Sequence, residues 1–232
     1  MTGNLSASLS EALGLLLRAD AELWRIVLLS LFVSSLAVTL SALLALPVAL
    51  AVAWREFPGK RIVIGLVNSL IAVPAVVIGL LLYLALSRSG PFGALGLLFT
   101  PRAMILAQAF LALPLLTGLF IAALQSVGRR VKETALTLGA SPLQAALTLL
   151  REARFALLAA YTTGFARLLG ETGMTMMVGG NIRGQTRVMT TAIALETLRG
   201  NFELGIALGI ILFTVAIGVN IILQILQGRA GR

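Results

Sequence analysis

Charged and hydroxyl side chains are rare in this sequence of 232 residues, which is 59% hydrophobic and 12% charged. One group of them lies in and just after GGNIRGQTR, residues 179–187, where three glycines free the backbone to turn. Guanidinium groups and neutral hydrogen-bond donors together suit a tetrahedral oxyanion. Such a group could contact an anion, lipid headgroups or the acidic surface of a partner. Its members are Asn181, Arg183, Thr186, Arg187, Thr190 and Thr191.

A second candidate group is a pair of opposite charges inside an apolar stretch. Arg167 and Glu171 are four residues apart, so on a helix they share one face. Because a charge at the bilayer centre costs about 2.5–3.5 kcal/mol on insertion scales, we expect the two to pair and to face protein or water. Two interpretations stay open: an ion pair that lines or gates a pathway, and a structural pair near the end of a span. The neighbouring Gly170 and Gly173 predict a bend or a close helix approach at this point.

Several other chemistries are excluded by the composition. The chain has no Cys and no His, which rules out thiol catalysis, disulfides and His-ligated metal or haem. It has no G-x-x-x-x-G-K-[ST] segment and no evident nucleophile–base set, so we expect no nucleotide site, catalytic residue or metal site. The net charge of +9 resides in loops between apolar segments, which argues against nucleic-acid binding.

The segment KETALTLGASPLQ, residues 132–144, combines charge, helix formers and helix breakers. Residues 133–138 favour a helix, and Gly139 is the type of residue found just past a helix end, where φ is positive. Ser141 is a good N-cap, and Pro142 fits the first turn of a following helix. The sequence therefore predicts a helix, a sharp corner and a second helix. The small residues of E-x-A-x-x-x-G would let the groove of a partner approach closely; an ordinary re-entrant cytoplasmic loop is the alternative.

The elements that must position these groups are membrane spans. An ordinary soluble domain is about 25% charged, and the mean hydropathy here is +1.01. Five stretches have about the 20 apolar residues that a spanning helix needs. The predicted fold class is all-α, a single membrane domain over residues 1–232 with about five transmembrane helices. The predicted spans are 26–53, 62–86, 103–127, 155–178 and 202–226.

The flanking segments predict the orientation of these spans. Residues 1–22 have leucines on one helical face, which predicts an amphipathic interfacial helix rather than a signal peptide. Lys and Arg favour one side by ten to seven, and we expect this side in the cytoplasm, with the N-terminus outside and the C-terminus inside. The predicted cytoplasmic set is Arg55, Lys60, Arg61, Arg129, Arg130, Lys132, Arg151, Arg154, Arg229 and Arg232. The predicted outer set is Arg18, Arg25, Arg88, Arg102, Arg183, Arg187 and Arg199.

Small and cyclic residues within the spans predict where helices bend or approach one another. Pro47, Pro74 and Pro114 each remove a backbone hydrogen bond, so we expect kinks there. Gly205 and Gly209 form a G-x-x-x-G in the last span, a spacing that permits close contact between helices of a dimer.

The corner KETALTLGAS resembles the EAA loop of ABC importer permeases, E-A-A-x-x-x-G in its usual form, with Thr134 in place of the middle Ala. That family often ends the loop with a Leu-Pro pair, where this sequence has REAR, residues 151–154. PAVVIGLLLYLALSRSGPFG, RLLGETGMTMMVGGNIRGQTRVMTTAIALET and the closing span are similar to permeases for tungstate and molybdate. The segment GGNIRGQTRVMTTAIALE is the most specific and is closer to the tungstate branch.

This resemblance implies a type I ABC importer permease fold, with a cytoplasmic coupling helix in residues 128–154. It implies a homodimer in the cell membrane, an ATPase dimer that binds ATP and Mg, and an extracytoplasmic binding protein that delivers the oxyanion. No cofactor is expected in this chain itself. The residues expected to rest in a cleft of the ATPase are Glu133, Thr134, Ala135, Gly139, Ala140, Ser141 and Pro142.

The resemblance also gives roles to the outer polar residues. Arg183 and Arg187 are expected to contact the acidic rim of the binding protein or lipid headgroups rather than to coordinate the ion directly. The residues expected along the translocation pathway or its gate are Arg167, Glu171, Asn181, Thr190 and Thr191.

Two alternatives stay open for the function. The cargo of the same class of importer could be molybdate, or sulfate or phosphate, because tungstate and molybdate are almost equal in size and charge. The chain could also be a stand-alone anion channel or an ion-coupled carrier, and the EAA-like corner argues against that class.

Overall fold

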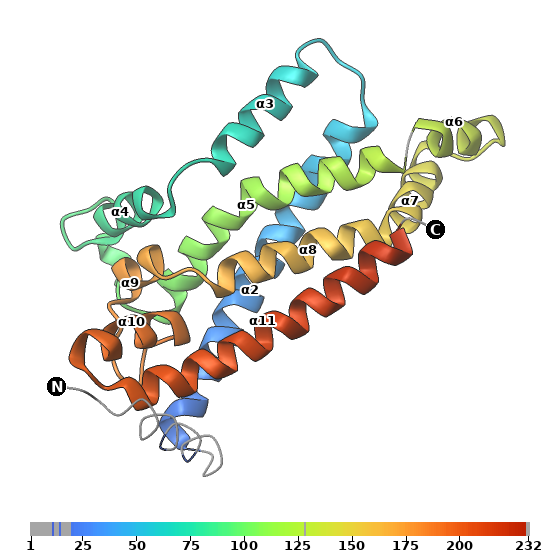
Figure 1. The fold of residues 1–232 in the computed structure, drawn as a ribbon. Helices are drawn as coiled ribbons and strands as arrows, with labels where there is room; N and C mark the ends of the chain where they lie inside the picture. Colours follow the sequence, from blue (N-terminus) through green and yellow to red (C-terminus); the bar gives the residue numbers. More distant parts are fainter. Residues whose placement is uncertain (1–10, 12–13, 15–19, 128, 231–232) are drawn as a thin grey trace. The chain divides into compact units, whose positions relative to one another are not determined.

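The computed structural model describes residues 11, 14, 20–127 and 129–230 (Figure 1). Within these ranges the chain forms α-helices and one short 3-10 helix, η1, and no strand. The predicted all-α fold class is therefore confirmed. The interfacial helix predicted for residues 1–22 lies almost entirely outside the described residues. The helices are α2 (Ala21–Trp54), α3 (Lys60–Ile71), α4 (Ala75–Leu86), η1 (Gly93–Leu95), α5 (Pro101–Ser126), α6 (Arg129–Thr137), α7 (Pro142–Glu152), α8 (Arg154–Leu169), α9 (Gly173–Gly179), α10 (Met189–Arg199) and α11 (Phe202–Ala230).

Three of the described helices, α2, α5 and α11, are each long and apolar enough to cross a membrane. They correspond to the first, third and fifth predicted spans. Pro47 lies inside α2 and Pro114 inside α5, and both helices continue past their proline. The apolar character and length of these helices confirm that the chain is a multi-pass membrane protein.

The second predicted span, 62–86, is wrong as an uninterrupted helix. It consists of α3 and α4, of 12 residues each, separated at residues 72–74. Pro74 is the N-cap residue of α4, with φ −61° and ψ 130°. A proline disfavours the helical conformation in the residue before it, so the chain leaves the helix here. Counting α3 and α4 together as one broken span brings the total among the described helices to four.

The fourth predicted span, 155–178, is also wrong as an uninterrupted helix. Helix α8 has 16 residues and ends at Leu169, and the seven-residue α9 begins at Gly173. The intervening Glu171 is held by bonds that replace helical ones. Its carbonyl accepts a hydrogen bond from Thr190 Oγ1 at 2.9 Å, and its Oε1 accepts one from the Met174 N–H at 3.2 Å. The bend predicted beside Gly170 is thus a complete break.

The chain divides into two compact units, and the four longest helices, α2, α5, α8 and α11, contribute to both. Unit 1 is Met1–Ala37, Pro74–Gln108 and Arg167–Gly218, and unit 2 is Val38–Val73, Ala109–Ala166 and Val219–Arg232. All residues of the predicted cytoplasmic set belong to unit 2, and all of the predicted outer set belong to unit 1. Unit 2 has ten basic and three acidic residues, whereas unit 1 has eight and six. The prediction of a single membrane domain stays a prediction.

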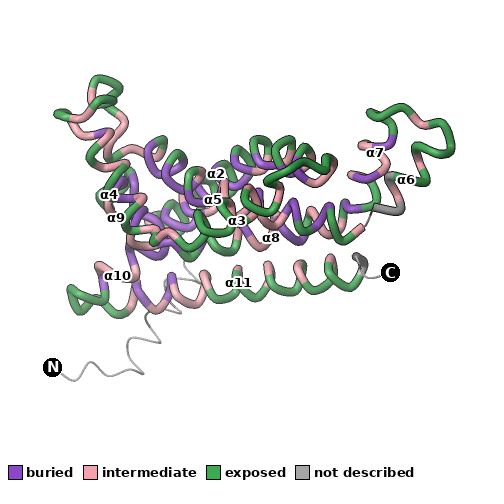
Figure 2. The backbone as a smooth tube through the Cα atoms, turned by 90° about the horizontal axis from the view of Figure 1, so that it is seen from above, coloured by how far each residue is buried: buried purple, intermediate pink, exposed green. Residues whose placement is uncertain are grey.

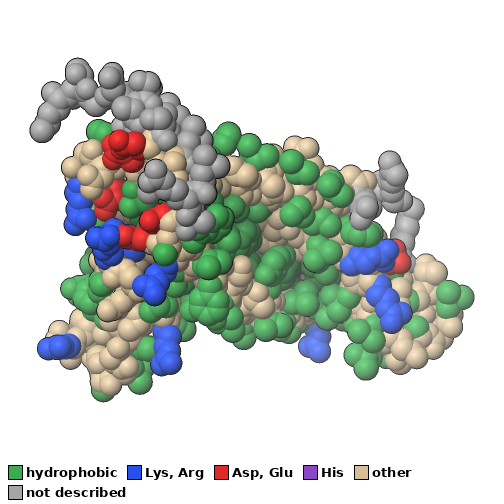
Figure 3. Space-filling view, turned by 90° about the horizontal axis from the view of Figure 1, so that it is seen from below, with side chains coloured by type: hydrophobic (Ala, Val, Ile, Leu, Met, Phe, Trp, Pro, Cys, Tyr) green, Lys and Arg blue, Asp and Glu red, His purple; other side chains and the backbone are tan. Residues whose placement is uncertain are grey.

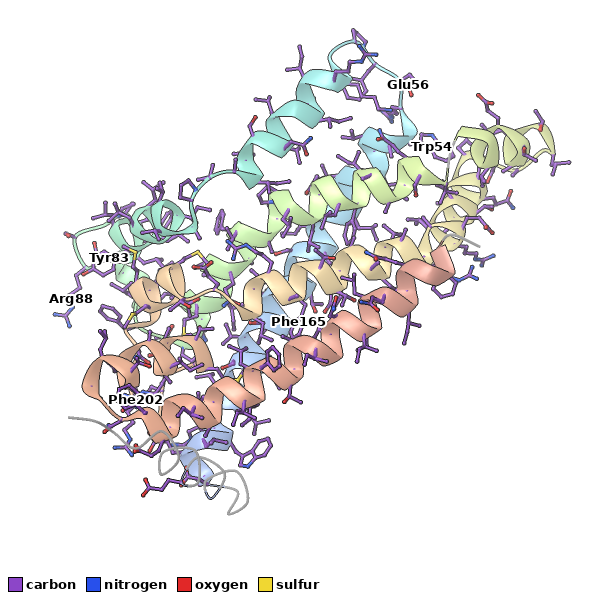
Figure 4. All side chains as sticks on the ribbon, in the orientation of Figure 1. Trp54, Glu56, Tyr83, Arg88, Phe165 and Phe202 are labelled. Carbon is purple, nitrogen blue, oxygen red and sulfur yellow. The ribbon has the colours of Figure 1, made fainter. Side chains whose placement is uncertain are left out.

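Close packing in unit 1 joins α4 to α9, which lie side by side in Figure 1. A Cβ added to Gly79 of α4 would lie 3.0 Å from the Met174 Cα of α9, so the glycine allows the two helices to approach closely. Gly173 likewise faces Val76, which confirms the close helix approach predicted there. Farther along α4, Tyr83 (labelled in Figure 4) packs edge-on against the Phe99 ring, with centroids 6.2 Å apart.

Unit 2 packs α8 against α5 and α2. Gly164 of α8 lies close to Leu116 of α5. A Cβ added to this glycine would lie 2.7 Å from the Leu116 Cδ2. The hydroxyls of Thr39 and Tyr161 lie 2.9 Å apart and tie α2 to α8. Helix α11 is packed less tightly. Only 17% of the residues in its most apolar stretch are buried. Figure 2 shows the helix exposed or half-buried along much of its length. A Cβ on its Gly209 would meet no other atom within 4 Å.

Candidate functional site

The predicted corner is present in unit 2, and we call residues 129–152, which comprise α6, the corner and α7, the elbow. Gly139 has φ +84°, the left-handed conformation that a glycine adopts without strain. The Ala140 N–H bonds to the Ala135 carbonyl at 3.0 Å and closes the last turn of α6. Ser141 Oγ accepts from the Gln144 N–H at 3.3 Å, and Gln144 Oε1 accepts from the Ser141 N–H at 2.8 Å, a reciprocal cap that starts α7. The predicted helix, corner and helix are confirmed.

The elbow exposes apolar side chains at its corner. Leu138 is 82% exposed and Leu143 is 70% exposed, whereas Ala145 and Leu149 on the other face of α7 are buried. A Cβ added to Gly139 would meet no atom within 4 Å, so backbone conformation rather than packing requires this glycine. Apolar side chains gathered on an exposed surface are typical of an interaction site. Of the predicted contact residues, Glu133, Thr134, Ser141 and Pro142 are exposed, and Ala135 and Ala140 are half-buried.

Arg167 and Glu171 form the predicted ion pair where α8 breaks. Arg167 Nη1 donates to Glu171 Oε2 at 2.9 Å. The Glu171 side chain is only 8% exposed, whereas the Arg167 side chain is 48% exposed. The buried carboxylate therefore has a charged partner and a backbone donor, as a buried charge requires. Its arginine still presents positive charge at the surface of unit 1.

The neutral polar residues of the outer loop are bonded to one another. Asn181, Thr190 and Thr191 are all buried. Asn181 Nδ2 donates to the Thr191 carbonyl at 3.0 Å, and the Thr191 hydroxyl lies 3.0 Å from Asn181 Oδ1. Thr186 Oγ1 donates to the Gly179 carbonyl and accepts from the Ile182 N–H. These side chains hold the shape of the loop and its contact with α10.

Arginine and glutamate side chains meet beside this loop in what we call the arginine–glutamate cluster: Glu22, Arg183, Arg187, Glu196 and Arg199. Arg183 Nε donates to Glu22 Oε1 at 2.7 Å, and its Nη2 pairs with the other oxygen of the same carboxylate. Arg187 Nη1 lies 3.2 Å from Glu196 Oε1 and 3.6 Å from Glu22 Oε1. Arg199 Nη1 reaches Glu196 Oε1 at 3.3 Å. The cluster links the start of α2, the outer loop and the end of α10.

The two arginines predicted for docking differ in exposure. The Arg183 side chain is 73% exposed, and that of Arg187 is 7% exposed. The hydrogen bond and the negative charge of Glu22 raise the pKa of Arg183 above its usual value, so this side chain stays charged. Arg187 is a buried cation compensated by two carboxylates, and only Arg183 is open to a partner.

The arginine–glutamate cluster borders an open cavity of about 760 Å³ in unit 1. Figure 3 shows acidic and basic side chains close together in this region. Three arginines line the cavity against four glutamates, so its wall is not the positive surface that the arginines alone predict. The lining residues are Glu11, Gly14, Glu22, Arg183, Arg187, Glu196, Arg199, Asn201, Glu203 and Leu204.

The arginines of the cluster were predicted from the sequence, whereas their partners Glu22 and Glu196 were not. Glu22 and Glu196 are acidic residues beside apolar stretches on the predicted outer side, and this was the available signal. Gln108, buried in the middle of a predicted span, carried the same kind of signal. The structure joins Arg167 to Glu171 and Asn181 to Thr191 within unit 1, whereas the elbow residues belong to unit 2.

A protein-family comparison assigns the class. The model of a family described as "Binding-protein-dependent transport system inner membrane component" matches residues 26–232. The chain belongs to this permease family. The resemblance noted from the corner and the outer segment is thereby confirmed, and the permease is a multi-pass membrane component of a transport system.

The permease is similar to permease proteins of other transport systems over most of its length. It is 38% identical to the tungstate uptake system permease protein TupB of Peptoclostridium acidaminophilum, over 93% of this chain and 95% of that protein. It is 45% identical to a probable anion ABC transporter permease protein of Haloferax volcanii, over 82% and 84%. It is 33% identical to the molybdenum transport system permease protein ModB of Haemophilus influenzae, over 68% and 75%.

The fold of the permease is also found in a solved structure. The crystal structure of an amino acid ABC transporter with histidines superposes with a TM-score of 0.62 and covers 92% of this chain and 96% of that one. The sequence identity is 18%, so this likeness shows the fold alone. The expected type I importer permease fold is confirmed.

Proposed function

We propose that this chain is the transmembrane permease subunit of an ATP-driven importer that carries tungstate into the cytoplasm. The observation that carries the proposal is the similarity to a tungstate uptake permease over nearly the full length of both chains. Molybdate is the second candidate cargo, because the molybdenum permease is also related, at 33% identity over a smaller share of the chain.

The proposed assembly contains two copies of this chain, an ATPase dimer and an extracytoplasmic oxyanion-binding protein. In this proposal ATP and Mg bind to the ATPase, and no nucleotide site, cofactor or catalytic residue is assigned to this chain. The exposed apolar face of α11 supports contact with lipid or with the second copy, because Phe213, Ile217 and Ile221 are all exposed there. Nucleic acid is not a partner.

The elbow is the proposed contact with the ATPase. Leu138 and Leu143 enter its cleft, and the small residues around Gly139 let the cleft approach the backbone. The closed corner geometry and the capped α7 support this role, because a lever must be stiff to transmit movement. Movement of the ATPase then moves α8, which begins two residues after α7 ends.

The orientation follows from the charges of the two units. The predicted Lys and Arg set of unit 2 has ten members and that of unit 1 has seven, which supports a cytoplasmic unit 2, with the C-terminus inside and the N-terminus outside. Unit 1 then faces the binding protein. Arg183 is the proposed docking contact, and Arg88, exposed and directed away from the helices in Figure 4, is a second.

The proposed pathway includes the exposed edge of Arg167, which is the charge most suited to attract an oxyanion within unit 1. Glu171 keeps that arginine oriented. Asn181, Thr190 and Thr191 act on the pathway through the shape of the outer loop, because their polar groups are bonded within it. Arg187 positions the loop through Glu22 and Glu196.

Reconstitution of the complete transporter tests the function. Liposomes that contain the permease, the ATPase and the cognate binding protein are supplied with ATP and with tungstate, molybdate or sulfate at low concentration. Tungstate uptake that requires both ATP and the ATPase is the expected result. Equal uptake without the ATPase would identify a stand-alone channel or carrier, and uptake of molybdate alone would replace the cargo.

A further inference from the structure

A small buried cavity in unit 1 has no role in the scheme above. Its volume is about 10 Å³, close to the minimum of about 10–15 Å³ that one water molecule needs. Five of the seven residues that line it have polar side chains. The lining residues are Ser30, Ser34, Gln108, Leu169, Glu171, Val188 and Thr190.

Gln108 is the residue of this wall with an unmet hydrogen bond. It is 3% exposed, and its Nε2 donates to Thr175 Oγ1 at 3.3 Å and to the Leu168 carbonyl at 3.5 Å. Its Oε1 has no hydrogen-bond partner among the described protein atoms. This orientation of the amide places its nitrogen, which donates, toward the Leu168 carbonyl, which only accepts. The cavity wall therefore carries a buried acceptor that needs a donor.

Two of the nearby hydroxyl protons, those of Ser30 and Thr190, are already used. Ser30 Oγ donates to the Ile26 carbonyl at 2.7 Å and accepts from the Met189 N–H at 2.8 Å. Thr190 Oγ1 donates to the Glu171 carbonyl at 2.9 Å. A ligand that donates to Gln108 Oε1 and accepts from a hydroxyl such as that of Ser34 would satisfy the wall.

The charges of the wall select a neutral ligand. The carboxylate of Glu171 is paired with Arg167 at 2.9 Å, so an added cation would leave the site with an uncompensated positive charge. An oxyanion is excluded by the adjacent carboxylate and by the small volume. The cavity is therefore not a site for the proposed cargo.

We propose that this cavity binds one structural water molecule, which donates a hydrogen bond to Gln108 Oε1. The water joins α5 to the break between α8 and α9, to the entry of α10 and to α2, all within unit 1. It lies where the fourth predicted span is interrupted, between α8 and α9. Gln108 is thus a positioning residue for the segment that carries Glu171.

The test is a cryo-EM map of the complete transporter in lipid nanodiscs, at a resolution that shows other internal waters. The expected result is one rounded density at hydrogen-bond distance, about 2.7–3.2 Å, from the Gln108 side-chain oxygen. Addition of tungstate to the sample is expected to leave this density unchanged. A cavity without density in such a map overturns the proposal, and so does a strong density that appears with tungstate.

Two matched variants on α5 sharpen the result. Gln108→Leu is expected to abolish the density, whereas Gln125→Leu, the same change at an exposed position of the same helix, is expected to retain it. Persistence of the density in Gln108→Leu overturns the role of Gln108. The wild-type map by itself tests for the presence of the water, whether or not the Gln108→Leu variant folds.

Discussion

The elbow and the arginine–glutamate cluster use their side chains in opposite ways. The elbow has a backbone satisfied by its own caps and exposes the apolar side chains of Leu138 and Leu143. The cluster instead takes charged groups from the start of α2, the outer loop and α10, and it pairs them with one another, with Arg187 and Glu196 almost fully buried. The elbow leaves apolar side chains largely uncovered by this chain, whereas the cluster pairs most of its charges within it.

This difference separates residues that act on partners from residues that hold the fold. An arginine in a transporter of anions is easily assigned to the anion, yet Arg187 is committed to two carboxylates. An exposed leucine is easily overlooked, yet two of them at one corner are what the proposed ATPase contact requires. Substitutions should therefore damage stability at the cluster and assembly at the elbow.

The largest expected effect is that of Arg187→Ala. It leaves the buried carboxylate of Glu196 without its buried partner, and breaking such a pair costs about 3–5 kcal/mol. Arg183→Ala removes an exposed arginine from the same cluster and should cost about 1 kcal/mol or less. Thermal unfolding of the purified permease in nanodiscs measures both. Equal losses for the two variants would show that burial does not distinguish these arginines.

The next effect is that of Leu138→Asp at the elbow. A charge in the centre of an apolar contact should weaken ATPase binding by about 2 kcal/mol or more, roughly 30-fold, with little change in the stability of the permease. The control is Leu198→Asp in unit 1, because Leu198 is 83% exposed and Leu138 is 82% exposed. The measurement is affinity for the ATPase dimer without binding protein. Similar weakening by both variants would mean that the effect is not specific to the elbow.

The smallest effect compares two glycines. Gly139→Ala places a side chain at φ +84° and should strain the corner by about 1 kcal/mol, which lowers ATPase affinity roughly fivefold. Gly205→Ala lies inside α11, where its Cβ meets only Thr197 Oγ1 at 3.6 Å, an ordinary contact. It should leave ATPase affinity unchanged and stabilise the helix slightly. An unchanged ATPase affinity in Gly139→Ala would indicate that the positive φ at this position does not strain an alanine.

The elbow could be predicted in detail because its determinants are local. Gly139, Ser141 and Pro142 act within a few residues, through a positive φ, a cap and a fixed ring. The outer cluster could not, because Glu22 and Arg183 are 161 residues apart in sequence, and nothing local pairs them. The sequence shows the arginines but not the glutamates that pair with them. The positive charge predicted for the outer loop is therefore larger than the structure has.

The broken spans show a similar limit. Hydropathy detects apolar length, and residues 155–178 have it. The helix nevertheless stops before Glu171, whose carbonyl bonds to Thr190, 19 residues away. At residues 72–74 the signal was local, since Pro74 was visible, but a proline inside a span permits either a kink or a break.

The account depends most on the elbow being the surface that binds the ATPase. Because the chain has no cysteine, single cysteines can report on chosen positions of an otherwise unmodified protein. Leu138→Cys and Leu198→Cys are labelled with a water-soluble maleimide, each with and without the ATPase dimer. The account predicts that the ATPase protects position 138 at least tenfold and leaves position 198 unchanged. Full labelling at position 138 while the ATPase is demonstrably bound would contradict it.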